Sequence, residues 1–468
     1  MKNFRMDGER NHMPLRGCIR AANALLFIFL LGFAFTTNVV KAQTSPDTEL
    51  TSAELPDTLT IADLTTYAYD NNPAILEARK EWEAQVERYR IETGYPDPQL
   101  MFTYFPEPIE TRLGPQDWNA SLSQKIPFPG KLGKAGEVVT AEARVARFKL
   151  DKTVRDVMVG IRESFFELSY IRKATSIVQK NMTLLDHIRK VAETSHAQDR
   201  ATLTDVVKAQ SQTGQLRYDA LLLEELEATE VARLNGLLNR APDTLVGTLA
   251  PEKVQALAYS VDEMYRLAED HQEEIQIANA RVEKADALFD LARYKNRPDF
   301  KLGLFYAGIG NPDVSVLPED AGRDGFGIQA GMTLPLWFGK NKGRTAQAAA
   351  RKQKAEAAKT RSINQAHTNI RAVYFRLDNA RRLIELYRDD LLPQAAQSME
   401  IAETWFAEGE SSLTDFVEAQ SVWYNFQLAL TRAQADYGKY LARLERLVGQ
   451  DLIQKRDRLS EEQAEEEK

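Results

Sequence analysis

The stretch KIPFPGKLGK, at positions 125–134, joins two different patterns in this chain. Polar and apolar residues alternate before it, and after Pro129 no proline occurs until Pro242. Alternation is typical of a β-strand, whereas a long proline-free stretch favours a helix. A similar junction, TLPLWFGKNKG, stands at 333–343. The pattern therefore predicts that the chain passes twice from a strand into a very long helix.

The two junctions belong to a tandem repeat. LTDVVKAQS (203–211) matches LTDFVEAQS (413–421), and IRESFFEL (161–168) matches IRAVYFRL (370–377). Such self-similarity predicts one structural unit used twice, which is too few copies for a solenoid. We therefore expect a closed pseudo-symmetric assembly. The predicted divisions are a first repeat at 43–240, a linker at 241–260 and a second repeat at 261–452.

The two ends of the chain have their own compositions. Basic residues, an apolar run and the small-x-small pattern VKA (40–42) predict an export signal at 1–42, with a retained anchor as the alternative and Met13 as a second possible start. The single cysteine, Cys18, lies before the apolar run, so we expect neither a lipid anchor nor a disulfide in the mature chain. The charged tail at 453–468 is expected to be disordered.

The helical stretches are unusually long. One helix is predicted from Lys131 to about Thr194, a length of roughly 95 Å at 1.5 Å per residue. Apolar residues recur every seven positions in the second repeat, which indicates coiled-coil packing: Ile363, Ile370, Leu377, Ile384 and Leu391. Pro393 is expected to kink or break the later helix. Shorter helices are predicted over 73–93 and 273–295.

Each long helix is expected to turn back as a hairpin. The first turn is predicted at 197–201 and the second at 408–411, where Gly409 suits a helix end. The returning helices begin with Thr202-x-x-Asp205 and Ser412-x-x-Asp415, which are capping-box patterns.

Four alternating segments predict four strands. Two are predicted at 117–126 and 325–336, and two more are marked by Leu100 to Tyr104 and Phe300 to Tyr306. One apolar face and aromatic residues near the ends fit an outer-membrane barrel, although a sheet covering a soluble core gives a similar pattern. Four strands cannot close a barrel, but three chains would supply twelve strands and a coaxial tube of twelve helices. The fold class is therefore α+β.

Composition argues against several functions. The net charge is −8 and the first 42 residues are basic, so the rest is acidic and does not suit nucleic acid. GKLGK (130–134) lacks the spacing and the Ser/Thr of a phosphate loop. The four histidines past residue 42 do not have metal-ligand spacing: His187, His196, His271 and His367. We therefore predict a non-enzyme without a catalytic, cofactor or metal site.

These features together resemble the TolC-type outer-membrane efflux protein family, over about residues 57–452. The resemblance is carried by the doubled repeat, NNPAI (71–75), IPFPGK (126–131) and the doubled LTD…AQ motif. It implies a homotrimer with a 12-stranded barrel in the outer-membrane lipid and a helical tunnel in the periplasm. It also implies two partners, a periplasmic membrane-fusion adaptor and an inner-membrane efflux pump, with the channel itself passive.

The resemblance places a pore constriction after the hairpin turns. The matching residues are Asp415 and Glu418, with Asp205 and Lys208 as their counterparts in the first repeat. Three copies would form carboxylate rings that favour cations. Asp415 could equally serve as a helix cap, so Glu418 is the clearer candidate. Lys208 is expected to pair with an acid across the aperture.

The hairpin ends are expected to contact the adaptor, with simple turn formation as the competing interpretation. The candidate residues are Thr202, Leu203 and Thr204 in the first repeat and Gly409, Ser412, Leu413 and Thr414 in the second.

The strand–helix joints are expected to lie at the inner edge of the membrane. Their residues are Pro127, Phe128, Pro129 and Gly130, and in the second repeat Pro335, Trp337 and Gly339. Prolines end the strands, and Gly130 provides freedom for a bend before a helix that starts at Lys131.

The exported substrate stays open. IPFPGK resembles the heavy-metal cation branch of the family, but the chain lacks Met or His clusters, so drugs, detergents and peptides remain alternatives. The rival class is a periplasmic coiled-coil adaptor or structural protein, which would have one hairpin rather than two.

Overall fold

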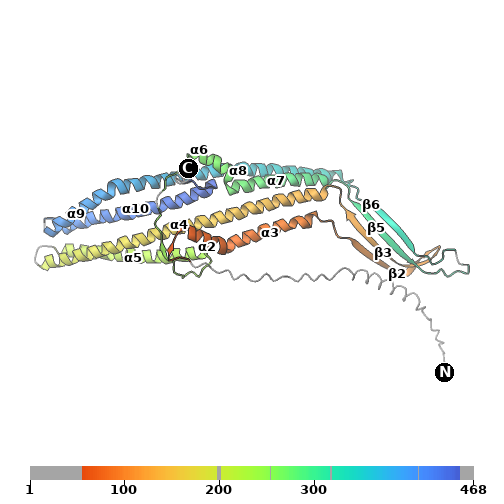
Figure 1. The fold of residues 1–468 in the computed structure, drawn as a ribbon, viewed down its shortest axis with the longest axis horizontal. Coiled ribbons are helices and arrows are strands. Elements are labelled where there is room, and N and C mark those ends of the chain that lie inside the picture. The colour runs from red at the N-terminus through yellow and green to blue at the C-terminus, as the bar shows by residue number, and fades with distance from the viewer. Residues whose placement is uncertain (1–54, 198–201, 253–254, 317–318, 409, 454–468) are drawn as a thin grey trace, which may run out of the picture. The chain divides into compact units, whose positions relative to one another are not determined.

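A computed structural model describes residues 55–197, 202–252, 255–316, 319–408 and 410–453. The predicted export signal, Gly409 and positions 454–468 of the predicted tail lie outside these residues. The described part divides into two compact units. A sheet unit is formed by Tyr95–Phe128 and Pro298–Leu334, and a helical unit by the other described residues (Figure 1).

The order of elements is nearly the same in the two halves of the chain. The first half contains β1 (Thr58–Leu59), α2 (Ile61–Asn71), α3 (Pro73–Thr93), β2 (Gln99–Thr111), β3 (Gly114–Ile126), α4 (Lys131–Ala197) and α5 (Leu203–Leu237). The second half contains β4 (Thr248–Leu249), α6 (Val261–His271), α7 (Glu273–Tyr294), β5 (Phe300–Ile309), β6 (Gly325–Met332), α8 (Phe338–Glu385), η1 (Leu386–Leu391), α9 (Leu392–Glu408) and α10 (Leu413–Val448).

Most predicted elements are confirmed, with four differences. The α4 helix begins at Lys131, as predicted. The last predicted strand ends at Met332 rather than at position 336; the Thr333 amide still bonds the Asp299 carbonyl, and Pro335 has no N–H to continue the ladder. Helices α2 and α6 were not predicted, and each begins with a capping box. Strand β4 lies inside the predicted linker, where it pairs with β1. Ile453 forms a bridge with Leu257, so the first position of the predicted tail is structured.

The sheet has the order β2-β3-β5-β6, with every pair antiparallel. Its register aligns apolar residues across all four strands, as in the row Leu100–Leu122–Leu304–Ile328. All four of these side chains are exposed. The opposite face carries small and polar residues, including Ser123 beside Gly303. The sheet unit therefore exposes one broad apolar face.

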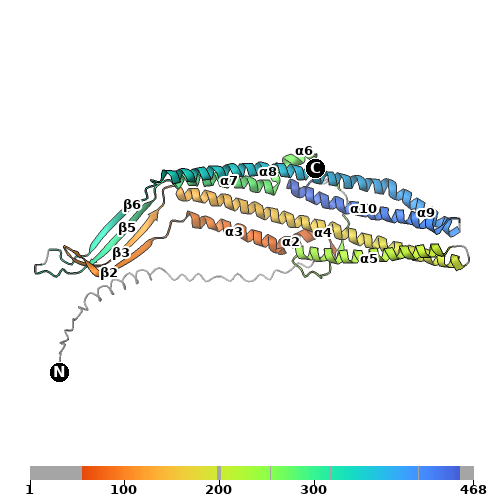
Figure 2. The same cartoon turned by 180° about the vertical axis from the view of Figure 1, so that it is seen from behind.

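The helical unit places four helices in the order α3–α4–α7–α8. Helix α4 packs against both α3 and α7, and α7 packs against both α4 and α8 (Figure 2). Helix α3 has one buried residue, Ile75. Helix α7 has nine, five of them alanines that permit close approach of its neighbours. The two equivalent helices are therefore enclosed to very different degrees.

A π-helical segment divides the second long helix. The repeats match at a distance of 209 residues at Ile161 and Ile370, but at 210 residues at Leu203 and Leu413. The π-helix η1 lies between these positions and takes one more residue per turn than an α-helix. Pro393, which follows it, cannot donate a hydrogen bond to the carbonyl four residues earlier. The extra residue and the proline together account for the predicted break.

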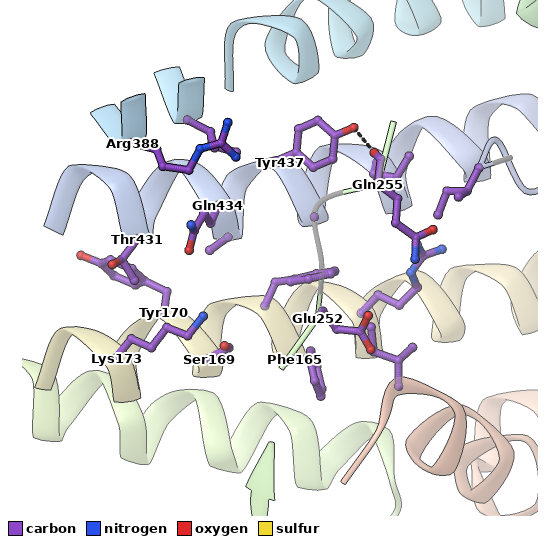
Figure 3. A pocket seen from close by; sticks show the side chains of 18 residues that line it. Phe165, Ser169, Tyr170, Lys173, Glu252, Gln255, Arg388, Thr431, Gln434 and Tyr437 are labelled. Carbon is purple, nitrogen blue, oxygen red and sulfur yellow. Dashed lines mark hydrogen bonds between the residues drawn. The ribbon is translucent and has the colours of Figure 1, made fainter. Parts of the chain in front are cut away.

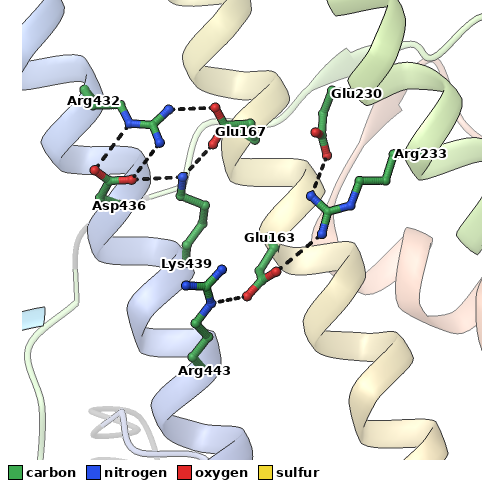
Figure 4. Close-up of polar contacts among 8 residues, drawn as sticks. All are labelled: Glu163, Glu167, Glu230, Arg233, Arg432, Asp436, Lys439 and Arg443. Carbon is green, nitrogen blue, oxygen red and sulfur yellow. Dashed lines mark hydrogen bonds and ion pairs between the residues drawn. The ribbon is translucent and has the colours of Figure 1, made fainter. Parts of the chain in front are cut away.

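Ion pairs connect α4 with α10. Glu167 accepts from Arg432 at 2.6 Å and from Lys439, while Glu163 binds Arg443 (Figure 4). Although burial opposes ionisation, the bonds from Lys439 and Arg432 lower the pKa of Glu167. We call the α4–α10 contact the charged seam. It joins the first repeat to the second, and its acids have no acidic counterparts on α8.

Candidate functional site at the hairpin ends

The second hairpin ends in a complete capping box. The Ser412 hydroxyl accepts from the Asp415 amide at 3.2 Å, and the Asp415 carboxylate accepts from the Ser412 hydroxyl at 2.7 Å. Ser412 has extended backbone angles, which suit an N-cap. The capping interpretation of Asp415 is therefore confirmed, and one of its carboxylate oxygens is already engaged.

Glu418 differs from Asp415 although it lies only one turn further along α10. Its side chain is exposed, and it makes no ion pair or hydrogen bond with the residues that the structure describes. Its counterpart Lys208 was predicted to pair with an acid across the aperture, which a single chain does not test. Within the chain, the Lys208 ammonium donates to the Thr414 hydroxyl at 2.9 Å. Asp205 lies in α5, and its side chain is outside the described part.

Three further polar contacts tie the first hairpin to α10. Gln420 donates to Asn181 at 2.7 Å, and both residues are buried. Tyr424 donates to Asp219 at 3.2 Å. Burial, followed by the nearby Asp219 carboxylate, raises the pKa of Tyr424.

The third contact joins Gln212 to Ser421, with the two side chains 3.3 Å apart. We did not predict any of these ties. Gln420 and Ser421 belong to the doubled AQS motif, which was the available signal.

The predicted adaptor residues lie in contrasting surroundings. Thr202, Leu203 and Thr204 are exposed, and 63% of the Leu203 surface is accessible. Its equivalent Leu413 is 1% exposed, in a core cluster with Phe416, because the start of α10 lies against the first hairpin. Leu413 therefore packs the two hairpins together and does not present a surface to a partner.

A groove runs between α9 and α10 beside the second turn. Its volume is about 730 Å³. Ile401 and Trp405 line it from α9, and both are exposed. Ser412 and Asp415 line it from the α10 side. An exposed tryptophan beside polar groups is a common anchor in protein interfaces.

A second cavity, of about 420 Å³, lies between α4 and α10 near the charged seam (Figure 3). Phe165, Tyr170 and Tyr437 line it, and the Tyr437 hydroxyl donates to the Gln255 carbonyl. At Gly438 a Cβ atom would lie 2.5 Å from the Phe166 ring, so α10 approaches α4 closely there. Lys173, Glu252 and Arg388 also line this cavity, so its lining is mixed aromatic and charged.

The two strand–helix joints differ in conformation. Strand β3 ends immediately before Pro127, and Gly130 has φ +84°, which favours glycine. A Cβ atom at Gly130 would also lie 3.0 Å from the Tyr294 ring. Pro129 is exposed, and the Phe128 amide donates to Asp299 at 3.2 Å.

The second joint has a different geometry. After Pro335, Trp337 is the N-cap of α8 and is exposed, whereas Phe128 is half-buried. Gly339 lies inside α8 with open space around it. Gly130 and Gly339 therefore match in sequence but not in conformation, because α8 begins one residue before its glycine.

Within the described residues, no helix has a stretch long and apolar enough to cross a membrane. No group of three or more His, Cys, Asp or Glu side chains there is arranged to hold a metal ion.

The chain is similar to known proteins of one kind, which are outer membrane export and efflux proteins. Residues 264–450 match the model of the outer membrane efflux protein family. The chain is 20% identical over 330 residues to the pyoverdine export outer membrane protein OpmQ of Pseudomonas aeruginosa, covering 69% of this chain and 68% of that protein.

Solved structures share the fold. The outer membrane protein VceC of Vibrio cholerae has a TM-score of 0.69 at 19% identity, covering 84% of this chain and 96% of that chain. CusC has a TM-score of 0.71 at 14% identity, covering 83% and 92%. The open-state MtrE outer membrane channel of Neisseria gonorrhoeae has a TM-score of 0.66 at 18% identity, covering 84% and 89%.

The relatives are transport channels rather than enzymes, and they remove the adaptor alternative. The exposed apolar face of the sheet, the doubled helical hairpins and these matches agree. Residues 264–450 match the outer membrane efflux protein family, and the chain is similar over most of its length to outer membrane efflux proteins and shares their fold.

Proposed function

We propose that three copies of this chain form a passive conduit of a tripartite efflux system. The conduit receives substrate from a periplasmic membrane-fusion adaptor and an inner-membrane pump, and the pump supplies the energy. The observation that carries the proposal is the four-stranded sheet with one continuous apolar, exposed face. Such a face suits contact with lipid, as in transmembrane barrels.

The open edges of the sheet support three copies. Strands β2 and β6 each have one neighbour in the sheet of the described residues. An unpaired strand edge has free N–H and C=O groups that can pair with other chains, and closure into a barrel leaves no such edge. Joining β6 of one copy to β2 of the next would give twelve strands from three copies, which leaves an aqueous interior.

The test is the behaviour of the full chain in membranes. We expect the protein in the outer-membrane fraction as a heat-modifiable trimer that forms discrete conductance steps in planar bilayers. A soluble monomer, or a membrane protein that forms no pore, would contradict the proposal.

We propose that Glu418 forms the main carboxylate ring of the constriction. Two observations support this role. The Glu418 side chain is exposed, and it has no partner within the described structure, so its carboxylate is available to ions. Asp415 contributes its free oxygen, and Asp205 is the equivalent acid of the first hairpin. Lys208 acts differently, because its bond to Thr414 links the two hairpins at this level.

The constriction is tested in single channels. Glu418→Ala is expected to raise conductance and to weaken block by multivalent cations, and the Asp415→Ala/Glu418→Ala double variant more so. Lys208→Met is the matched control that changes a charge on the facing helix. Unchanged conductance in the double variant would show that Asp415 and Glu418 do not form the constriction.

We propose that the adaptor contacts both hairpin ends. Thr202, Leu203 and Thr204 offer an exposed surface on the first hairpin, and Ser412 and Thr414 border the second. Gly409, which was predicted to contact the adaptor as well, lies outside the described residues. The groove with Ile401 and Trp405 gives the second end an apolar anchor. Leu413 is left out because it is buried.

Substitution of Leu203 and Trp405 by Asp tests this contact. Export should fall while the level of folded trimer and its conductance in bilayers stay normal. Leu245→Asp, at an exposed apolar position between α5 and β4, controls for a general effect of new surface charge. Normal export in the Leu203/Trp405 variant would argue that the ends only form turns.

A further inference from the structure

The end of α7 and the start of α8 are strongly basic. Positions 291–297 and 335–348 together contain six Lys or Arg residues and no Asp or Glu. The six are Arg293, Lys295, Arg297, Lys340, Lys342 and Arg344. The equivalent stretches of the first repeat, 91–97 and 126–139, contain two lysines and three acids. The formal charge is therefore +6 at this joint of the second repeat and −1 at the joint of the first.

Hydrogen bonds hold the two basic segments together. The Arg344 guanidinium donates to the Asn296 side chain at 2.7 Å and to the Lys295 carbonyl at 3.2 Å. The Asn296 amide donates in turn to the Asn341 carbonyl at 3.4 Å. The end of α7 is therefore fixed against the first turns of α8, and the cations of both segments lie at one end of the helical unit.

Three lysines of this group are not neutralised within the described part of the chain. Lys295, Lys340 and Lys342 are exposed and make no ion pair with the described residues. The acids that flank the end of α7 in the sequence, Asp290 and Asp299, each bind a lysine outside the group, at 3.1 and 3.2 Å. The three lysines, which we call the basic cluster, are therefore available to an anionic partner.

Large apolar side chains lie uncovered beside the basic cluster. Leu336, Trp337 and Phe338 are 63%, 75% and 78% exposed. At the equivalent positions the first joint has two prolines and the half-buried Phe128. Contiguous exposed apolar residues mark contact with another protein or with a membrane. The second joint therefore combines an apolar surface with positive charge, and the first joint has neither.

The chain keeps this surface close to the end of a strand. Strand β6 ends at Met332, five residues before Trp337. Five extended residues span at most about 18 Å, so Trp337 lies within that distance of the strand end however the chain turns between them. Beside a strand that contacts lipid, aromatic rings suit the boundary of the acyl chains, and lysines suit the phosphates above it.

We propose that the second strand–helix joint binds the headgroups of anionic phospholipids in the periplasmic leaflet of the outer membrane, and that the first joint does not. The side chains of Leu336, Trp337 and Phe338 enter the boundary of the acyl chains, and the basic cluster faces the phosphates. A free phosphate ion would satisfy the lysines but would leave the apolar side chains uncovered. This inference rests on the proposed membrane channel and names the lipid class that each copy recognises.

Brominated lipids test the contact at Trp337, because bromine atoms on acyl chains quench nearby tryptophans. The full chain is reconstituted in bilayers that contain brominated phosphatidylglycerol or brominated phosphatidylcholine as a minor lipid. The signal of Trp337 is the difference between the parent and its Trp337→Phe variant. We expect phosphatidylglycerol to be preferred roughly tenfold at low salt, with a smaller preference at high salt, because salt screens the charges. Equal quenching by the two lipids, or none by either, would overturn the proposal.

Removal of the basic cluster tests the cause of the preference. The Lys295→Gln/Lys340→Gln/Lys342→Gln variant should bind the two lipids about equally, while quenching by phosphatidylcholine stays as in the parent, since the apolar side chains are unchanged. A variant that kept the preference would show that other groups select the lipid. Inorganic phosphate, compared with chloride at equal ionic strength, should not displace phosphatidylglycerol, and displacement would assign the lysines to a free-anion site instead.

The matched control removes the same number of exposed lysines from α4: Lys149→Gln, Lys173→Gln and Lys180→Gln. It should keep the parent's preference, and an equal loss in the control would attribute the effect to net charge and overturn the site. A conducting parent without any lipid preference would overturn this inference and leave the channel proposal in place. A parent that does not enter bilayers would contradict the channel proposal itself.

Discussion

Helices α3 and α7 occupy the same place in their repeats, but the chain encloses only one of them. Alanines and apolar residues of α7 are buried between α4 and α8, whereas α3 buries Ile75 alone and leaves Val86, Tyr89 and Ile91 exposed. Two helices at equivalent places in the repeats therefore have different surroundings, one exposed and one enclosed. The difference shows which positions the chain encloses by itself and which it leaves exposed.

The hairpin ends repeat this contrast at a smaller scale. Leu413 is buried where the second hairpin meets the first, and Leu203 is exposed at the equivalent position. The largest expected effect comes from this pair. Leu413→Ala should lower the free energy of unfolding of the helical unit by about 2–5 kcal/mol, as for other buried leucines. Leu203→Ala should change it by less than about 0.5 kcal/mol.

Thermal unfolding followed by circular dichroism measures both variants in detergent. Equal losses in the two variants would mean that the hairpin ends are enclosed alike and that the contrast is wrong.

The charged seam is a second difference between the two repeats, because α4 carries its acidic residues and the equivalent helix α8 does not. Glu167→Gln should destabilise the fold by roughly 2 kcal/mol, between the values for exposed and buried pairs, since Lys439 is almost buried.

Lowering the pH should weaken the same ion pairs of the charged seam. The ion pairs lower the pKa of Glu167 in the fold, so their stabilisation is present above the unfolded pKa of about 4.3 and is lost as pH falls through the folded value. The melting temperature of the parent should therefore drop below about pH 4. The Glu167→Gln variant should start lower and fall less steeply, and parallel curves would contradict this cause.

The glycines at the two strand–helix joints, Gly130 and Gly339, allow a direct test of how the joints differ. Gly130→Ala should cost about 1–2 kcal/mol, because an L-residue is strained at φ +84° and the new Cβ would crowd Tyr294. Gly339→Ala should be neutral or stabilising by up to about 1 kcal/mol, because alanine favours a helix and the space is open. Chemical denaturation of the two variants measures this difference, and equal costs would show that the joints are alike.

The smallest effect on stability is expected at the constriction. Asp415→Ala removes a capping box and should cost about 1 kcal/mol, whereas Glu418→Ala should cost about zero. Their order should reverse in conductance, where Glu418 dominates. Measuring melting and conductance on the same preparations separates the two roles, and a large stability loss in Glu418→Ala would assign it a structural one.

Elements that obey a strong local pattern were predicted well. The start of α4 at Lys131, the four strands and the Ser412 cap follow from prolines, alternation and capping residues. The short elements were missed. Strand β1 exists because Thr58 pairs with Thr248, far away in the sequence, and two-residue strands have no pattern of their own.

The site was predicted less completely for the same reason. The doubled LTD…AQ motif identified the hairpin starts, but it could not tell that Leu413 is buried or that Lys208 bonds Thr414. Those facts depend on how one hairpin lies against the other, which a match between two copies does not contain.

The sequence by itself determined the repeat, the strand–helix joints and the acidic residues after the turns. These are set by local rules of periodicity, proline and capping, which act within a few residues. Only the tertiary structure decided which copy of each element is enclosed, as for α7 rather than α3. Burial depends on which helices lie alongside, and two similar sequences at different places in one chain have different neighbours.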